Sequence, residues 1–157
     1  MSFFLQVAAE TMPAQTVLYQ RRTGPYGREN AALMEEMKHW MEKNRLFDGS
    51  AVILAVPLDD PAGTTPENCR YDVCTPERSQ RDLALGETKR RCLAGGSYAV
   101  FQIEHTAEAL QRAWEECFAE LPLHGFTFDP SRPVMERYAE KLVNRHLCEL
   151  CVPILCV

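Results

Sequence analysis

The residues of this chain that could do chemistry are mainly carboxylates inside strand-like segments. Glu136 lies within the run from Val134 to Tyr138, where strand alternation puts Glu136 and Tyr138 on one face and Arg137 on the other. Glu149 lies in a second strand-like, apolar run. Because an uncompensated carboxylate is costly to bury, each glutamate either faces solvent or lies in a pocket, where it would face a cation or a proton donor.

Two tryptophans indicate what such a pocket could bind. Trp40 and Trp114 occupy similar places late in the apolar stripes of two predicted helices. Aromatic residues at this spacing usually pack in a core. The alternative is a groove with one tryptophan from each half of the chain, which would suit aromatic cations by stacking and cation-π attraction. The expected ligand-binding residues are Glu136, Glu149, Trp40, Trp114, Met37, Leu110, Tyr98 and Tyr138.

Motifs for other chemistry are missing. The chain has no glycine-rich phosphate loop, no HExxH and no nucleophile-elbow serine, and its four histidines are scattered. Cys148 and Cys151 form a CxxC, but residues three apart in a strand point to opposite faces. Without a second CxxC or clustered histidines to complete a zinc set, we expect plain buried thiols, with a metal or redox role as the alternative. We expect no metal site and no cofactor.

The hydrophobic pattern predicts an α+β fold, mainly antiparallel sheet with two main helices on one side. The first helix carries apolar residues at helical spacing and ends near Asn44; the second has Thr106 as N-cap and stops at Pro122. Strands are expected at 5–9, 16–22, 51–56, 69–75, 89–104 with a break or bulge at its glycines, 134–138 and 147–155. The first two strands are expected to form a hairpin.

The chain also carries a repeated signature. Asp72-Val73-Cys74-Thr75-Pro76 and Glu149-Leu150-Cys151-Val152-Pro153 share the order acid, aliphatic, Cys, β-branched, Pro. A strand, a helix and a further strand precede each copy. We therefore expect one domain over 1–157, built from two strand-helix-strand-strand modules in pseudo-twofold arrangement, at about 1–76 and 89–157, with a linker at about 77–88 and a central ligand groove between the modules.

Composition limits the partners. The chain has 157 residues, 46% hydrophobic and 25% charged, with a net charge of −5. Direct binding to nucleic acid is not expected, because it needs many phosphate-neutralising cations. No apolar run approaches membrane-spanning length, no segment fits a signal peptide, and seven cysteines show no tight disulfide framework. We expect a cytoplasmic protein of unknown oligomeric state.

Four segments in this order resemble the GyrI-like small-molecule-binding domain, and the resemblance covers essentially the whole chain. They are the segments 16–27, 95–101, 133–138 and 149–154. The family includes the bacterial DNA gyrase inhibitor protein and the effector-binding domains of AraC-type and MerR-type regulators. The resemblance implies a duplicated fold, a pocket glutamate at Glu136 with a second acidic position at Glu149, and pocket aromatics at Trp40 and Trp114.

The resemblance leaves three functions open. The leading one is a stand-alone binding protein for amphipathic, aromatic and often cationic compounds, because no helix-turn-helix precedes the first strand. The second is a hydrolase of strained cyclopropane-bearing DNA-alkylating toxins, with Glu136 as base and Tyr98 or Tyr138 as helper. The third is a modulator that binds a protein partner, such as a transcription regulator or DNA gyrase.

Overall fold

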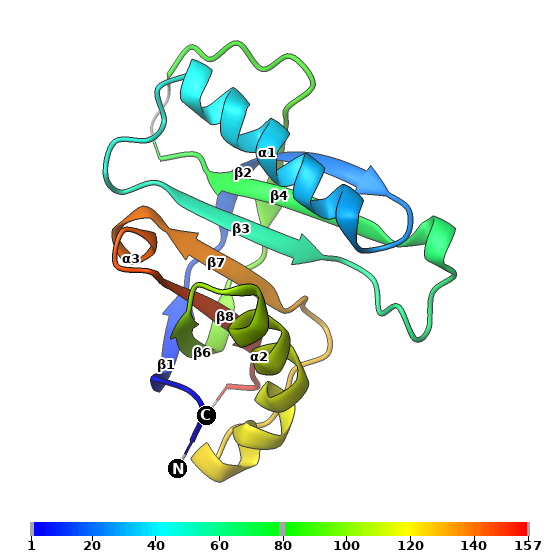
Figure 1. The fold of residues 1–157 in the computed structure, drawn as a ribbon, viewed down its shortest axis with the longest axis vertical. Coiled ribbons are helices and arrows are strands. Elements are labelled where there is room, and N and C mark those ends of the chain that lie inside the picture. The colour runs from blue at the N-terminus through cyan, green and yellow to red at the C-terminus, as the bar shows by residue number, and fades with distance from the viewer. Residues whose placement is uncertain (1, 79–80, 157) are drawn as a thin grey trace.

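The computed structural model describes residues 2–78 and 81–156, which form one curled antiparallel sheet with helices on one face (Figure 1). The sheet order is β1-β6-β8-β7-β3-β4-β2-β5. The strands are β1 Gln6–Met12, β2 Gln15–Thr23, β3 Val52–Pro57, β4 Arg70–Pro76, β5 Lys89–Leu93, β6 Gly96–Glu104, β7 Met135–Ala139 and β8 Leu147–Pro153. The helices are α1 Arg28–Lys43, α2 Ala107–Glu120 and α3 Glu140–Val143, with 3-10 turns at Pro66–Asn68 and Leu121–His124.

The sheet consists of two matched halves. One half is β1-β6-β8-β7 and the other is β5-β2-β4-β3, and they join where β3 pairs with β7. This order confirms the α+β fold and its duplicated, pseudo-twofold plan. Residues 77–88, expected to be a linker, connect β4 to β5; residues 79 and 80 lie outside the described part of the chain.

The expected hairpin of the first two strands is wrong. β1 belongs to the first sequence module but pairs with β6 of the second, while β5 of the second module takes the place beside β2. The two-residue link between β1 and β2 begins with Pro13. A two-residue hairpin turn needs positive φ, which the proline ring forbids. Each half of the sheet therefore takes its edge strand from the other sequence module.

The two crossing links touch at Gly95. A Cβ at this position would lie 2.5 Å from the carbonyl oxygen of Met12 and 2.6 Å from the carbonyl carbon of Pro13, and it would also clash with the backbone nitrogen of Ala14. Only glycine leaves room for this approach of two backbones. The predicted break at the glycines is thus the point where the exchanged strands cross.

The helices cover one face of the sheet and leave its middle less covered. In Figure 1, α1 crosses β2 and β4, and α2 crosses β6 and β8, with β3 and β7 between them. Thr106 caps α2 as expected, because its side chain accepts a hydrogen bond from the Ala109 amide at 3.1 Å. Pro122 does not end the helical path at once, since it lies in the 3-10 turn that follows α2.

Apolar residues fill three clusters. One lies under α2 and includes Phe101 and Cys148, and another lies under α1 and includes Met37 and Val73. The third lies on the sheet face away from these helices and includes Tyr98 and Cys151. Cys148 and Cys151 therefore point to opposite faces, as strand alternation predicts, and both are buried free thiols.

Candidate functional site

The main cavity lies on the helix-covered face where the two halves meet. It encloses about 880 Å³ and reaches from the start of α1 to α2, over β4 and β7. Its aromatic walls are Tyr26, Tyr71, Trp114, Phe118 and Phe128. The loops after β3 and before β7 complete it with prolines. A cavity of this size and character suits a drug-sized aromatic molecule.

Glu136 is the central polar group of the main cavity. Its Oε2 accepts a hydrogen bond from the indole nitrogen of Trp114 at 2.7 Å, and its Oε1 accepts one from the Tyr138 hydroxyl at 2.6 Å. Both donors are neutral, and within the described residues no arginine, lysine or histidine forms an ion pair with Glu136. The carboxylate is therefore held in place without being neutralised.

The tyrosines around Glu136 are kept protonated. Burial raises the pKa of Tyr138 far above its usual range, and the Glu136 charge raises it further. Burial and Glu136 raise the pKa of Tyr71 in the same way. Both side chains thus act as neutral hydroxyl groups at any physiological pH.

The remaining charges at the main cavity are two acids and one base. Asp59 is in an ion pair with Arg70 at 2.9 Å, and Arg132 is in one with Asp129 at 3.3 Å. The guanidinium of Arg132 also lies 4.7 Å from the centre of the Tyr98 ring. Because these two pairs cancel, Glu136 and Asp60 give the cavity its negative charge.

Of the residues expected at the site, the structure brings three together: Glu136, Trp114 and Tyr138. Glu149 lies elsewhere, on the opposite sheet face, where its Oε1 accepts a hydrogen bond from Arg137 at 2.8 Å. Trp40 packs over the first half of the sheet, and its indole nitrogen donates to the carbonyl oxygen of Ala84 at 2.9 Å.

The other three expected residues pack in the apolar clusters. Met37 of α1 is fully buried against the sheet, and Leu110 of α2 packs against the cluster under that helix. Tyr98 is 1% exposed on the sheet face away from the helices. Sequence reasoning missed Phe118 and Phe128 as cavity walls. Phe118 could have been found, because it follows Trp114 by four residues and so lies on the same face of α2.

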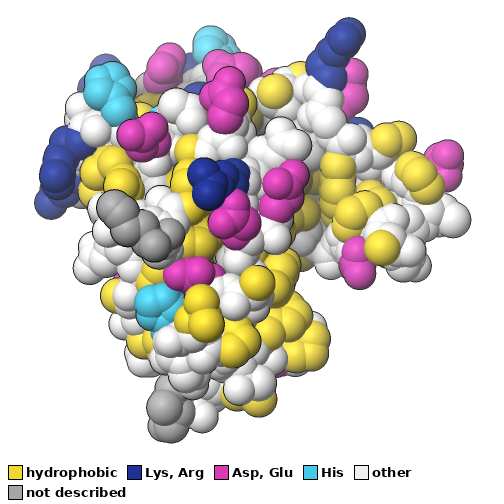
Figure 2. All heavy atoms as spheres, turned by 60° about the horizontal axis from the view of Figure 1, so that its bottom comes forward, with side chains coloured by type: hydrophobic (Ala, Val, Ile, Leu, Met, Phe, Trp, Pro, Cys, Tyr) yellow, Lys and Arg dark blue, Asp and Glu magenta, His cyan; other side chains and the backbone are white. Residues whose placement is uncertain are grey.

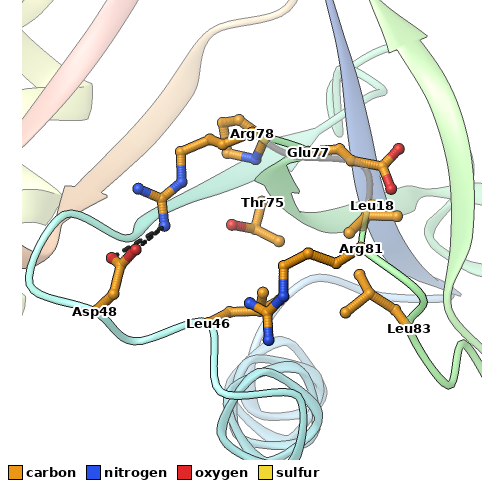
Figure 3. Close-up of a pocket in the computed structure, with 9 residues that line it drawn as sticks. Leu18, Leu46, Asp48, Thr75, Glu77, Arg78, Arg81 and Leu83 are labelled. Carbon is orange, nitrogen blue, oxygen red and sulfur yellow. Dashed lines mark hydrogen bonds and ion pairs between the residues drawn. The ribbon is translucent and has the colours of Figure 1, made fainter.

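A smaller hollow beside the end of α1 offers less. It measures about 180 Å³, and Figure 3 shows its charged side chains arranged around Thr75. Arg78 is paired with Asp48 at 3.0 Å, and Arg81 donates to the carbonyl oxygen of Asn44 at 2.9 Å. These contacts hold the segment after β4 in place beside α1. The two arginines therefore already have partners within the protein, and the hollow is a weaker candidate for a ligand site.

The surface carries no obvious nucleic-acid site on the face seen in Figure 2. There the lysine and arginine side chains stand apart, separated by acidic and apolar ones. Among the described residues, no cluster of three or more His, Cys, Asp or Glu could hold a metal ion. No helix in the described ranges 2–78 and 81–156 is long and apolar enough to cross a membrane.

Comparison with known structures shows that other proteins have the same fold. EcmrR, solved in a DNA complex, matches with a TM-score of 0.67 at 14% identity, over 97% of this chain and 58% of EcmrR. SAV2435, solved with bound tetraphenylphosphonium, matches with a TM-score of 0.60 at 15% identity, over 96% of this chain and 94% of SAV2435.

Sequence comparison gives nearer relatives. The SPbeta prophage-derived protein YosT of Bacillus subtilis (strain 168), which is named for transcriptional regulation, is 38% identical over 96% of this chain and 99% of YosT. A DNA gyrase inhibitor of Edwardsiella ictaluri is 28% identical over 96% of this chain and 98% of the inhibitor. The model of the GyrI-like small molecule binding domain matches residues 5–155. The chain therefore belongs to the GyrI-like family of small-molecule-binding domains.

Proposed function

We propose that this domain binds amphipathic aromatic cations in the main cavity, with Glu136 as the charge partner. The observation that carries this proposal is the state of Glu136: its carboxylate is oriented by two neutral donors and has no cationic partner among the described residues. A ligand cation would supply the missing charge in a partly desolvated site, where electrostatic attraction is stronger than in water.

The walls of the cavity favour the same ligands. Tyr71, Trp114 and Phe128 present aromatic surface around the carboxylate. Such rings attract delocalised cations by about 0.5–2 kcal/mol each, depending on desolvation. A flat or propeller-shaped aromatic cation could satisfy both features at once, whereas an anion would face Glu136 and Asp60 at close range.

The proposed role is that of an effector-binding protein. YosT, the relative named for transcriptional regulation, matches this chain over almost its whole length. SAV2435 has the same fold and was solved with a phosphonium cation. These likenesses support a sensor of small molecules that reports to a partner, and the partner itself is left to experiment.

The test is a titration with tetraphenylphosphonium and with neutral triphenylphosphine oxide, followed by tryptophan fluorescence. We expect the wild type to prefer the cation. Glu136→Gln should weaken cation binding by about 1.5–3 kcal/mol, or roughly 10- to 150-fold, and leave the neutral compound unaffected. The control is Glu115→Gln, which removes one exposed carboxylate from α2 and should change neither.

The outcomes separate the alternatives. Equal affinity of the cation for wild type and Glu136→Gln would remove Glu136 from the site and overturn the proposal. For the hydrolase alternative, Tyr98 lies on the other sheet face, which leaves Tyr138 as the helper beside Glu136. Product formation from a strained cyclopropane substrate, lost in Glu136→Gln, would replace the binding proposal with that reaction.

A further inference from the structure

A second cavity is lined by Tyr138, the residue that donates a hydrogen bond to Glu136. It encloses about 220 Å³ between α1, the start of β3 and α3. Its apolar walls are Met34, Phe47, Ile53 and Val143. The volume equals about seven water molecules at ~30 Å³ each. This side cavity is too small for a drug-sized ligand and suits a single ring or a branched aliphatic group.

Tyr138 links the two cavities, because it lines the side cavity and donates a hydrogen bond to Glu136, which lines the main cavity. Its ring lines the side cavity and lies 5.4 Å from the ring of His105, while its hydroxyl donates to Glu136 at 2.6 Å. A group that packs against this ring in the side cavity therefore also acts on the donor that orients Glu136. The two cavities are joined by one side chain and one hydrogen bond.

The two charged groups of the side cavity, Lys38 and Glu140, differ in their charge and in their hydrogen-bond partners. The Glu140 carboxylate keeps its negative charge, and its Oε1 accepts hydrogen bonds from the neutral backbone amides of Gly49 at 3.0 Å and Ala51 at 3.2 Å, so Lys38 is the lining group that can attract an anion. Among the described residues, the one ion pair of Lys38 is an exposed contact with Glu35 at 3.5 Å on its own helix. Such surface pairs contribute little, so the ammonium group of Lys38 is free to bind an anion at the rim.

His105 completes the rim as a hydrogen-bonding group. Burial lowers its pKa, and the positive fields of Lys38 and His146 lower it further. The imidazole is therefore neutral near pH 7 and can donate one hydrogen bond and accept another. The ammonium group of Lys38 and the neutral imidazole of His105 line the same hollow as the apolar side chains. Together these groups suit a small ligand that has an apolar body and one carboxylate.

We propose that the side cavity is a second binding site, for a small aromatic or branched aliphatic carboxylate. The apolar body would lie between Met34, Ile53 and Val143, and the carboxylate would face Lys38. Because the Tyr138 hydroxyl donates to Glu136, binding in the side cavity would change the affinity of the main cavity for its cation. This coupling rests on the proposed function, whereas the second site itself does not.

The site is tested with 4-fluorobenzoate as the probe, observed by fluorine NMR, and with 4-fluorobenzyl alcohol as its neutral counterpart. We expect the carboxylate to bind the wild type better than the alcohol. Lys38→Met keeps an unbranched side chain but removes its ammonium group, and it should weaken carboxylate binding about tenfold, the lower end for a lost charged hydrogen bond. Val143→Phe fills the hollow and should abolish binding, while the control Lys43→Met, in the last turn of α1, should not change it.

Three results would overturn the site: no carboxylate binding at millimolar concentration, equal binding of the alcohol, or full affinity in Lys38→Met. The coupling is tested by titrating tetraphenylphosphonium with and without saturating 4-fluorobenzoate. We expect a shift in cation affinity of about fivefold or more, which disappears in Tyr138→Phe. An unchanged cation affinity in the wild type would overturn the coupling. If the cation fails to bind while 4-fluorobenzoate still does, the main-cavity proposal fails and the second site stands.

Discussion

The repeated acid of the sequence signature allows a quantitative prediction about stability. Asp72 is fully buried, and its carboxylate accepts four hydrogen bonds of 2.6–3.1 Å from Arg21 and Arg91. Its counterpart Glu149 accepts one hydrogen bond from Arg137, at 2.8 Å. Arg137 is also held by two hydrogen bonds to Glu10, at 2.9 and 3.0 Å. The two acids thus differ in what their removal leaves behind.

We expect Asp72→Asn to destabilise the protein more than Glu149→Gln. The first change leaves two guanidinium groups facing each other, and breaking a buried pair costs about 3–5 kcal/mol. The side chains of Arg21 and Arg91 are 35% and 23% exposed and can regain water, so we take the lower end, about 3 kcal/mol. Glu149→Gln leaves Arg137 paired with Glu10, and the loss of the charge from its own hydrogen bond to Arg137 costs about 1.5 kcal/mol.

Urea unfolding followed by tryptophan fluorescence measures both changes. With a slope of about 2 kcal/mol per molar urea, the midpoint should fall by about 1.5 M in Asp72→Asn and by roughly half that in Glu149→Gln. Glu115→Gln, an exposed control, should stay within about 0.5 kcal/mol of the wild type. If Asp72→Asn costs no more than Glu149→Gln, the count of remaining partners does not govern stability and the reasoning is refuted.

Three further predictions concern the strand crossing, acid stability and the thiols. Gly95→Ala should lower the free energy of unfolding by about 1–3 kcal/mol, because its Cβ would meet the backbone of the link between β1 and β2. Gly63→Ala is the control, since its Cβ would lie 4.0 Å from the nearest atom, and it should leave the stability unchanged. Thermal unfolding of both variants measures the difference. Hydrogen bonds from the arginine on β4 lower the pKa of Asp59 to about 2, so its contribution to stability is present above pH 4 and is lost as the pH falls toward 2. The free energy of unfolding, measured over a pH series, should therefore fall more between pH 4 and pH 2 in the wild type than in Asp59→Asn. Iodoacetamide at pH 8 should modify Cys92 and Cys156, the exposed thiols, and spare the five buried ones; mass spectrometry of the intact protein counts the adducts, and a third fast adduct would contradict the burial.

Local features of the chain could be predicted because they depend on near neighbours in sequence. The Thr106 cap, the two amphipathic helices and the central strands follow from capping, helical spacing and aliphatic runs. The opposite directions of Cys148 and Cys151 follow from the two-residue period of a strand. Even the duplication was visible, since each half must repeat the pattern that buries its own sheet face.

The site was predicted only in part, because it combines segments distant in the sequence. Glu136 and Tyr138 lie on one strand, and alternation alone puts them on the same face. That Trp114 reaches this carboxylate while Trp40 does not depends on how each helix lies across the sheet, and Trp40 is held by Ala84 from the segment after β4. The same limit applies to Glu149, whose face was set by alternation but whose partner Arg137 depends on strand pairing.

The sequence by itself determined which residues share a strand face, where the second helix begins, and that the fold is built twice. Tertiary structure alone decided that β1 and β5 exchange places, because each edge strand can pair with either half and the choice depends on long-range packing and on the Pro13 link. It also decided which aromatic rings surround Glu136. The physical reason is the range of the interactions: periodicity and capping act over a few residues, whereas the cavity forms only where β3 and β7 join the two halves.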